Sequence, residues 1–190
     1  MGRVGTSLAL ALVTLLVGVG SAVLCLRGWS GVNDVQFGPW RSSSLIGSAQ
    51  AQPFLRAAVA MNGILALNRG ETIYFTAITD DQNRPLTGAC RYQLIGRDPD
   101  ARWWSFTVYG SDMYLVPNPQ HRYSATRDNV SRDADGRFDI ELGGPPEPAS
   151  WIAVPAGRFV LTLRAYNPGA ALTANPAAAE LPQILRGSCS

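Results

Sequence analysis

One loop of the sequence gathers side chains that could take part in chemistry. The single histidine, His121, comes after Asp112 and Tyr114 and is followed by Arg122 and Tyr123 in the segment DMYLVPNPQHRY. A histidine that catalyses acyl transfer needs a nucleophile and a carboxylate held beside it, and no G-x-S-x-G motif presents a serine in this sequence. We therefore expect His121 to lie in a surface loop. The same five side chains form a candidate loop for binding a small ligand.

Metal and cofactor chemistry is not expected. One histidine and three separated cysteines cannot supply the three or four ligands of a usual zinc site. The run SRDADG at 131–136 places oxygen atoms at alternate positions, like half of a calcium loop, but Leu142 stands where an EF-hand needs its bidentate Glu. We interpret this run as a hairpin turn. Nearby carboxylates could furnish a glycosidase pair, although the sequence does not determine their separation.

Two of the cysteines could form a disulfide if the chain is exported from the cytoplasm. If the domain is exported, Cys90 and Cys189 would both meet an oxidising environment, and a disulfide between them would close a loop of about 100 residues. We expect this bridge to pin the C-terminal tail to a strand. Cys25 lies in an apolar stretch and is expected to remain an unpaired, small apolar residue.

That apolar stretch is a candidate transmembrane helix. From Val4 to Leu26 no residue is charged, and about 23 residues at 1.5 Å each can cross a hydrocarbon core of roughly 30 Å. Arg3 and Arg27 flank the stretch, so the positive-inside signal is nearly balanced. A cleaved signal peptide is the alternative, with small residues at 20–22, but the length of the run favours an anchor over residues 1–27. Both interpretations export the rest of the chain.

Residues 28–52 are expected to form a linker at the membrane surface. They show no periodicity and contain several glycines and a run of three serines. A free linker rarely carries large aromatic side chains. We therefore expect Phe37 and Trp40 to press against the membrane surface or the exported domain, and Trp29 to act as an aromatic anchor at the membrane interface. All three are candidate contacts with the membrane or a partner.

Residues 53–190 are expected to fold as one domain that begins with a short amphipathic helix. After Pro53, the residues Phe54, Ala58, Met61 and Leu65 follow at helical spacing, and we expect this apolar stripe to pack on the core.

The rest of this domain has the pattern of β-strands. At least five short segments alternate apolar and polar residues or are rich in β-branched and aromatic ones, with turn residues between them. The most aromatic segment, 103–109, places Trp104, Phe106 and Val108 on one side and is expected to nucleate the core. The pattern predicts an all-β fold, a jelly-roll-like antiparallel β-sandwich.

The charge of the chain argues against one class of partner. All 16 basic residues are Arg, the net charge is +2, and the Arg residues are scattered between Asp and Glu. Binding to nucleic acid needs a basic patch or stripe, so nucleic acid is not expected as a partner.

Longer blocks of the sequence resemble a known family. They include WWSFTVYGSDMYLVPNPQHRYS, RDADGRFDIEL and SWIAVPAGRFVLTLRAYNP, in which a W-S-x-T-x-Y strand and a D-A-D-G turn are the most specific parts. These blocks are similar to the bacterial domain-of-unknown-function family number twelve-fourteen, over roughly residues 38–186. The GPWR motif at 38–41 and the single span look like its short, membrane-anchored branch. The resemblance implies a jelly-roll-like β-sandwich in the bacterial envelope and transfers no catalytic residue.

The sequence leads to one expected function and one alternative. The expected protein has a single span in the bacterial inner membrane and a periplasmic β-sandwich, which serves other inner-membrane proteins as a non-catalytic accessory module. The alternative is an envelope enzyme, or a protein that binds a glycan-like or lipid-like molecule at 112–123. A deep pocket with convergent polar groups at that loop would favour the alternative, whereas a filled core and an exposed apolar patch near Phe37 and Trp40 would favour the module.

Overall fold

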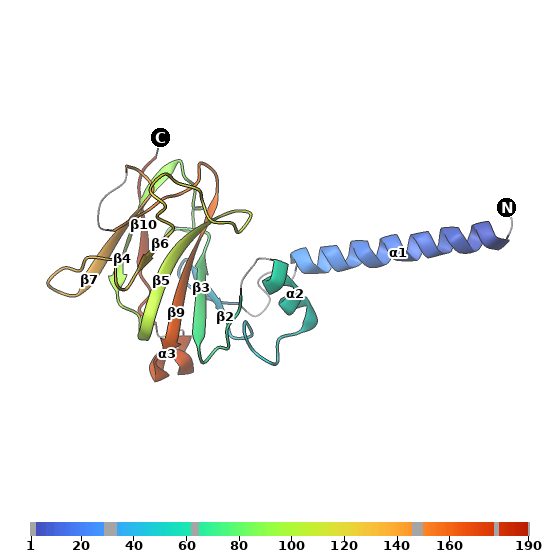
Figure 1. Cartoon of the computed structure of the whole chain (residues 1–190), viewed down its shortest axis with the longest axis horizontal. Coiled ribbons are helices and arrows are strands. Elements are labelled where there is room, and N and C mark those ends of the chain that lie inside the picture. The colour runs from blue at the N-terminus through green and yellow to red at the C-terminus, as the bar shows by residue number, and fades with distance from the viewer. Residues whose placement is uncertain (1–2, 29–33, 62–64, 146–149, 177–178, 190) are drawn as a thin grey trace.

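The computed structural model describes residues 3–28, 34–61, 65–145, 150–176 and 179–189, which form a long helix and a β-sandwich. Helix α1 (Arg3–Gly28) projects away from the sandwich along its whole length (Figure 1). Its Val4–Leu26 stretch has a mean hydropathy of 2.5, and none of it is buried against the rest of the chain. An apolar helix of this length that has no protein cover is suited to a lipid environment.

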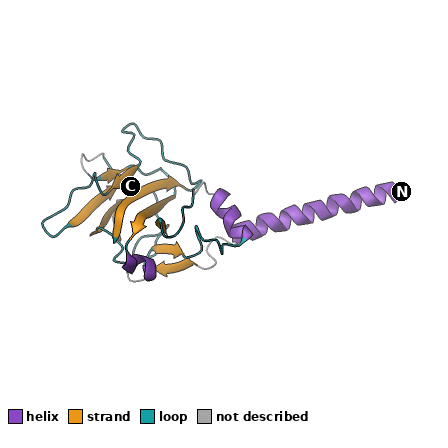
Figure 2. Cartoon of the chain, turned by 60° about the horizontal axis from the view of Figure 1, so that its bottom comes forward, coloured by secondary structure: helices purple, strands orange, loops and turns teal. Residues whose placement is uncertain are grey.

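Two sheets pack face to face, as the sequence predicts (Figure 2). All neighbouring strands run antiparallel except β7 and β8, which are parallel. The six-stranded sheet has the order β1 (Asp34–Phe37), β2 (Trp40–Ser43), β3 (Thr72–Ala77), β9 (Phe159–Pro168), β5 (Ala101–Gly110) and β6 (Ser124–Thr126). The four-stranded sheet has the order β10 (Gln183–Cys189), β4 (Cys90–Arg97), β7 (Arg137–Leu142) and β8 (Trp151–Ile152). Two short helices, α2 (Pro53–Met61) and α3 (Ala170–Ala174), complete the described elements.

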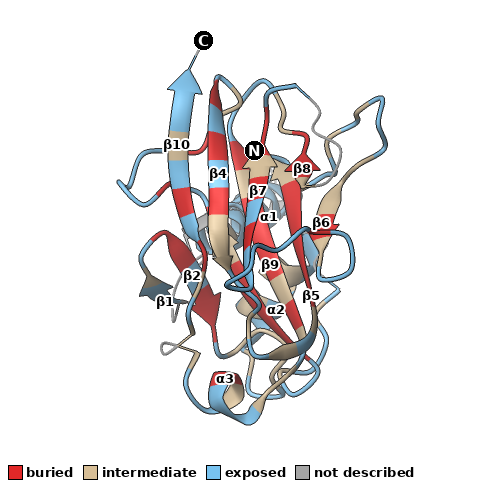
Figure 3. Cartoon of the chain, turned by 90° about the vertical axis from the view of Figure 1, so that its left-hand side faces the viewer, coloured by how far each residue is buried: buried red, intermediate tan, exposed pale blue. Residues whose placement is uncertain are grey.

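The core lies between the two sheets and is rich in aromatic residues (Figure 3). Strand β5 contributes Trp104 and Phe106, and β7 contributes Phe138 from the opposite sheet. The ring of Trp104 lies 5.2 Å from that of Phe106 and 5.1 Å from that of Phe138, measured between centroids. The aromatic strand predicted at 103–109 therefore lies inside the six-stranded sheet, and its buried side chains pack against the four-stranded sheet.

The expected linker is partly a piece of the sandwich, which corrects the sequence interpretation of residues 28–52. It contains β1 and β2, and β2 pairs with β3. Trp40 is only 1% exposed, and its indole N–H donates to the carbonyl oxygen of Pro182 at 2.8 Å. Phe37 is half-buried and packs edge-on against Phe75. Trp40 is thus a core residue, which confirms the alternative that it packs on the domain and excludes it as a contact with the membrane or a partner. Trp29 lies outside the described residues.

Trp40 gives a testable consequence. The substitution Trp40→Phe removes the indole donor, leaves the carbonyl of Pro182 without this partner in the interior and leaves space beside Phe106, whose ring is 6.1 Å away. We expect the free energy of unfolding to fall by about 2 kcal/mol, measured by urea denaturation. The matched change Trp103→Phe, at a half-exposed indole of β5, should cost clearly less. Equal losses for the two variants would contradict the core position of Trp40.

The apolar stripe of the predicted helix is exposed, so its expected packing on the core is wrong. Helix α2 ends at Met61, and none of its residues is buried. Met61 is 72% exposed and Leu65 is 91% exposed. A stripe at helical spacing shows that a helix has an apolar face, but it does not show what covers that face.

Candidate functional site

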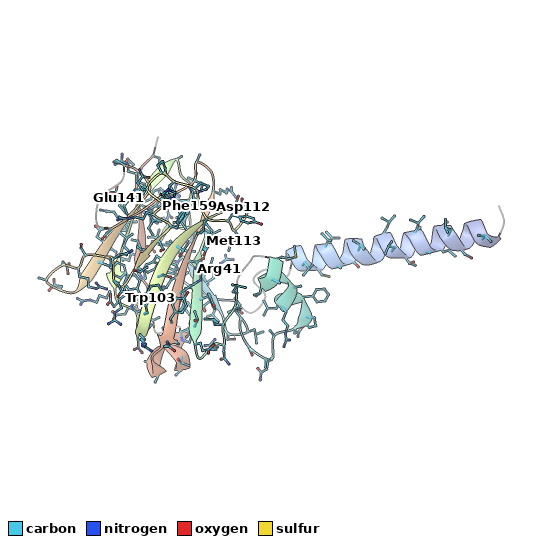
Figure 4. All side chains as sticks on the ribbon, viewed as in Figure 1. Arg41, Trp103, Asp112, Met113, Glu141 and Phe159 are labelled. Carbon is cyan, nitrogen blue, oxygen red and sulfur yellow. A yellow bond between two sulfur atoms is a disulfide. The ribbon has the colours of Figure 1, made fainter. Side chains whose placement is uncertain are left out.

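The predicted ligand loop begins as a tight turn that is held by its own backbone. The amide of Gly110 donates to the carbonyl of Tyr114 at 2.9 Å, and Tyr109 pairs with Leu115. The carboxylate of Asp112 accepts the amide of Tyr114 at 3.0 Å. Figure 4 shows Asp112 at the edge of the sandwich. Its carboxylate therefore stabilises the turn.

The second half of the loop is organised around Asn118. Its side-chain amide donates to the carbonyls of Val116 and Arg122, and its oxygen accepts the amide of Arg122 at 2.9 Å. His121 has a φ of 51° and is exposed, and Tyr114 is 75% exposed. Tyr123 and Arg122 are half-buried. The described cavities are lined by other residues, so these five side chains do not converge on one of them.

A cavity of about 320 Å³ lies between α3 and the turn that joins β4 to β5. Three carboxylates line it, those of Asp98, Asp100 and Glu180. Asp98 is already paired with Arg132, whose guanidinium lies 2.9 Å away. Within the described residues, no three His, Cys, Asp or Glu side chains are grouped so that they could hold a metal ion. We interpret this hollow as a surface feature that an arginine partly neutralises.

The outer face of the six-stranded sheet carries a cluster that the sequence analysis did not identify. The guanidinium of Arg164 donates to the hydroxyl of Tyr109 at 2.7 Å and lies over its ring at 5.3 Å. Strand register places Tyr74 beside Arg164, and Tyr166 beside Trp103, with 5.2 Å between the last two ring centroids. We call these five residues the arginine–aromatic cluster.

The chemistry of this cluster favours binding over catalysis. Burial raises the pKa of Tyr166 above 10.0, the charge of Arg164 opposes this increase, and the neighbouring Tyr74 and Tyr109 add to it. The phenol therefore stays protonated at neutral pH. A cation and flat aromatic rings can stack and donate hydrogen bonds. The signal in the sequence is the set of polar and aromatic residues that alternate with the buried apolar ones along β3, β5 and β9.

A second surface is formed by α2 and the chain on either side of it, residues 45–61 and 65–67, which we call the α2 segment. It encloses an open cavity of about 470 Å³. The hydroxyl of Tyr74 ties the segment to the sheet, because it donates to the carbonyl of Leu65 and accepts the amide of Leu67. Most of the lining is aliphatic and includes Leu45, Ile46, Leu55, Val59, Leu65 and Leu67.

The cysteines expected to pair are joined in the structure. Cys90 on β4 and Cys189 on β10 form a disulfide and lie opposite each other in the antiparallel ladder. Cys25 is a free cysteine exposed on α1. Near the disulfide, Arg186 of β10 forms an ion pair with the buried Asp80, with 2.8 Å between Nε and Oδ2.

The fold and these surfaces define a class of protein, a disulfide-bonded β-sandwich that follows an apolar N-terminal helix. The chain belongs to the DUF1214 family, described as proteins of unknown function, whose sequence model matches residues 71–170. The family predicted from the sequence is therefore confirmed. No curated protein matches this chain.

Two solved structures are similar to the chain. The crystal structure of the VPA0106 protein from Vibrio parahaemolyticus aligns with a TM-score of 0.63 at 21% identity, over 95% of this chain. The alignment covers 45% of the Vibrio protein, so this chain spans less than half of the length of that relative. A putative uncharacterized protein from Burkholderia cenocepacia aligns with a TM-score of 0.40 at 18% identity, over 61% of this chain and 29% of that one. The Vibrio structure supports the fold.

Proposed function

We propose that this protein is anchored in the bacterial inner membrane by a single span and displays its β-sandwich in the periplasm, as a non-catalytic interaction module of a membrane protein complex. The observation that carries the proposal is α1. Its Val4–Leu26 stretch is long enough to cross a bilayer, and none of it is buried by the rest of the chain.

The disulfide supports an exported domain. Bridges such as Cys90–Cys189 persist in oxidising compartments, including the bacterial periplasm, and are rare in the cytosol. The span and the disulfide together favour a topology in which α1 crosses the inner membrane and the sandwich lies outside the cytoplasm.

A role as a module is supported by the polar side chains of the candidate sites, which already bond to other groups of the domain. Asp112 and Asn118 stabilise their own loop, and Asp98 pairs with arginine. Exposed apolar side chains lie at the α2 segment, and not at Trp40, which is buried, so the patch predicted near Phe37 and Trp40 does not support the module.

A second candidate function is the binding of a small glycan-like or lipid-like molecule. The arginine–aromatic cluster favours it, because the hydroxyl of Thr162, on the same face, is buried and has no hydrogen-bond partner among the residues that the structure describes. The change Arg164→Gln should abolish such binding, whereas Arg122→Gln in the loop should leave it unchanged. Binding that is lost only with the loop variant would instead favour the site at 112–123.

The proposed function is tested first in membranes that carry a C-terminally tagged chain. The tagged chain should resist extraction by alkaline carbonate and should be digested by protease added to spheroplasts. After solubilisation in mild detergent, it should migrate with a larger complex of inner-membrane proteins in fixed stoichiometry. Release by carbonate would contradict the anchor, and recovery as a lone monomer or homo-oligomer would contradict the module.

A further inference from the structure

The α2 segment exposes several large apolar side chains. Met61 and Leu65 are largely exposed, and Leu67 and Phe54 are exposed to a smaller extent. Exposed apolar side chains that gather on one segment mark an interaction with a partner or a membrane. The question is therefore which of these covers the α2 segment.

The position of α2 relative to α1 points to lipid. The two helices contact each other, and α2 lies across the end of α1 instead of continuing it (Figures 1 and 2). The 23 residues of Val4–Leu26 rise about 34 Å, slightly more than the roughly 30 Å of a hydrocarbon core. If α1 spans the membrane, its C-terminal end lies at the level of the headgroups, and α2 lies at that level beside it.

The charge of this part of the chain suits an anionic surface. On the sandwich side of the span, residues 27–70 contain four Arg and a single acidic residue, Asp34. The remaining 120 residues contain 11 Arg and 13 Asp or Glu. Basic, apolar segments next to a span are attracted to anionic lipid, whereas the acidic remainder of the chain is repelled by it.

We infer that the α2 segment docks on the anionic lipid surface of the membrane that α1 spans. Met61 and Leu65 insert below the headgroups. The guanidinium of Arg56 donates to the carbonyls of Ala49 and Ala51 and is thereby held close to the segment, and its charge stays at the level of the headgroups. The inference rests on the proposed function, because it requires α1 to span the bilayer.

This second contact with the membrane orients the sandwich. A single span leaves a domain free to rotate about its connection, whereas a helix lying in the interface removes that freedom. Both α1 and α2 lie on the side of the six-stranded sheet (Figures 1 and 3). Docking of the α2 segment therefore turns this sheet towards the lipid and leaves the four-stranded sheet facing away.

The test uses the full chain in vesicles of phosphatidylcholine and phosphatidylglycerol, which contain no other protein. In a Cys25→Ala background, Met61→Cys carries an environment-sensitive fluorophore, and Leu65→Cys serves as a second position. Leu15→Cys, in the middle of α1, reports the span. Asp135→Cys, at an exposed side chain in the turn before β7, reports a side chain in water. Strand β7 lies far from α1 in Figure 1.

We expect the labels to differ in their exposure to lipid and to water. Labels at Met61 and Leu65 should be quenched by spin-labelled lipid and should be several-fold less accessible to iodide than the label at Asp135. Replacing phosphatidylglycerol with phosphatidylcholine should increase iodide access at Met61 several-fold.

Three outcomes would overturn the inference, and they have different meanings. Iodide access at Met61 equal to that at Asp135, with Leu15 still in lipid, overturns docking and leaves the anchor intact, as expected if a protein covers the α2 segment. Iodide access at Leu15 overturns the anchor and the docking together. Equal protection of Met61 in vesicles with and without phosphatidylglycerol overturns the role of anionic lipid.

Discussion

Replacing both Cys90 and Cys189 with serine is expected to lower the free energy of unfolding of the sandwich by up to about 4.7 kcal/mol. The disulfide joins residues with a sequence separation of 99. Such a cross-link lowers the conformational entropy of the unfolded chain, and the reduction grows with the length of the closed loop. The bridge also holds β10, an edge strand, at its last residue. Urea unfolding of the full chain in detergent micelles, followed by tryptophan fluorescence, measures the loss.

The free cysteine provides the matched control for this experiment. Cys25 is exposed on α1, so Cys25→Ser should unfold at the same urea concentration as the wild type. A reductant should lower the midpoint of the wild type towards that of the double variant and leave the double variant unchanged. Equal midpoints for the wild type and the double variant would contradict a stabilising role of the bridge.

Replacing Asp80 with alanine should lower the free energy of unfolding by about 3 to 5 kcal/mol, because it leaves the largely buried guanidinium of Arg186 without its partner. The side chain of Asp80 is 1% exposed and accepts Nε–H groups from Arg84 at 3.0 Å and from Arg186 at 2.8 Å. It also accepts the amides of Gln82 and Arg84. Arg186 belongs to β10 and lies over the ring of Tyr92, so the loss should loosen the same edge strand that the disulfide holds.

The pH dependence of the free energy of unfolding distinguishes the contribution of the Asp80 charge from the contribution of its packing. Burial alone raises the pKa of this carboxyl, but the hydrogen bonds from the Arg84 and Gln82 amides and from the guanidinium groups of Arg84 and Arg186 outweigh it, so the pKa lies below 3.8. Because the folded pKa is below the unfolded one, the stabilisation is complete above about pH 3.8 and is lost as the pH falls through the folded value.

The substitution Asp80→Asn tests this sign. Its deficit relative to the wild type should be largest near neutral pH and should shrink as the pH falls below about 3.8, measured by urea midpoints in a pH series. Asp135→Asn, at an exposed carboxyl of the turn before β7, is the matched control and should change stability little at any pH. A deficit of Asp80→Asn that does not change with pH would show that packing, and not charge, is responsible.

Local patterns in the sequence were sufficient for α1, for the interior strand β5 and for the family. The uncharged stretch Val4–Leu26 determines a helix with no polar face, and α1 is that helix. Alternation at Trp104, Phe106 and Val108 predicts one buried side of β5, and all three are buried. Both signals depend only on spacing along the chain, which a helix or a strand converts directly into faces.

Only the tertiary structure decided which partner covers each apolar side chain. Trp40 stands in a segment without periodicity and is buried because β2 pairs with β3 and the carbonyl of Pro182 reaches its indole. Met61 stands in a regular stripe and is exposed because the described part of the chain leaves that side of α2 uncovered. The arginine–aromatic cluster likewise exists only because β9 lies between β3 and β5. Burial depends on elements that are far apart in the chain, and spacing within one element carries no information about its neighbours.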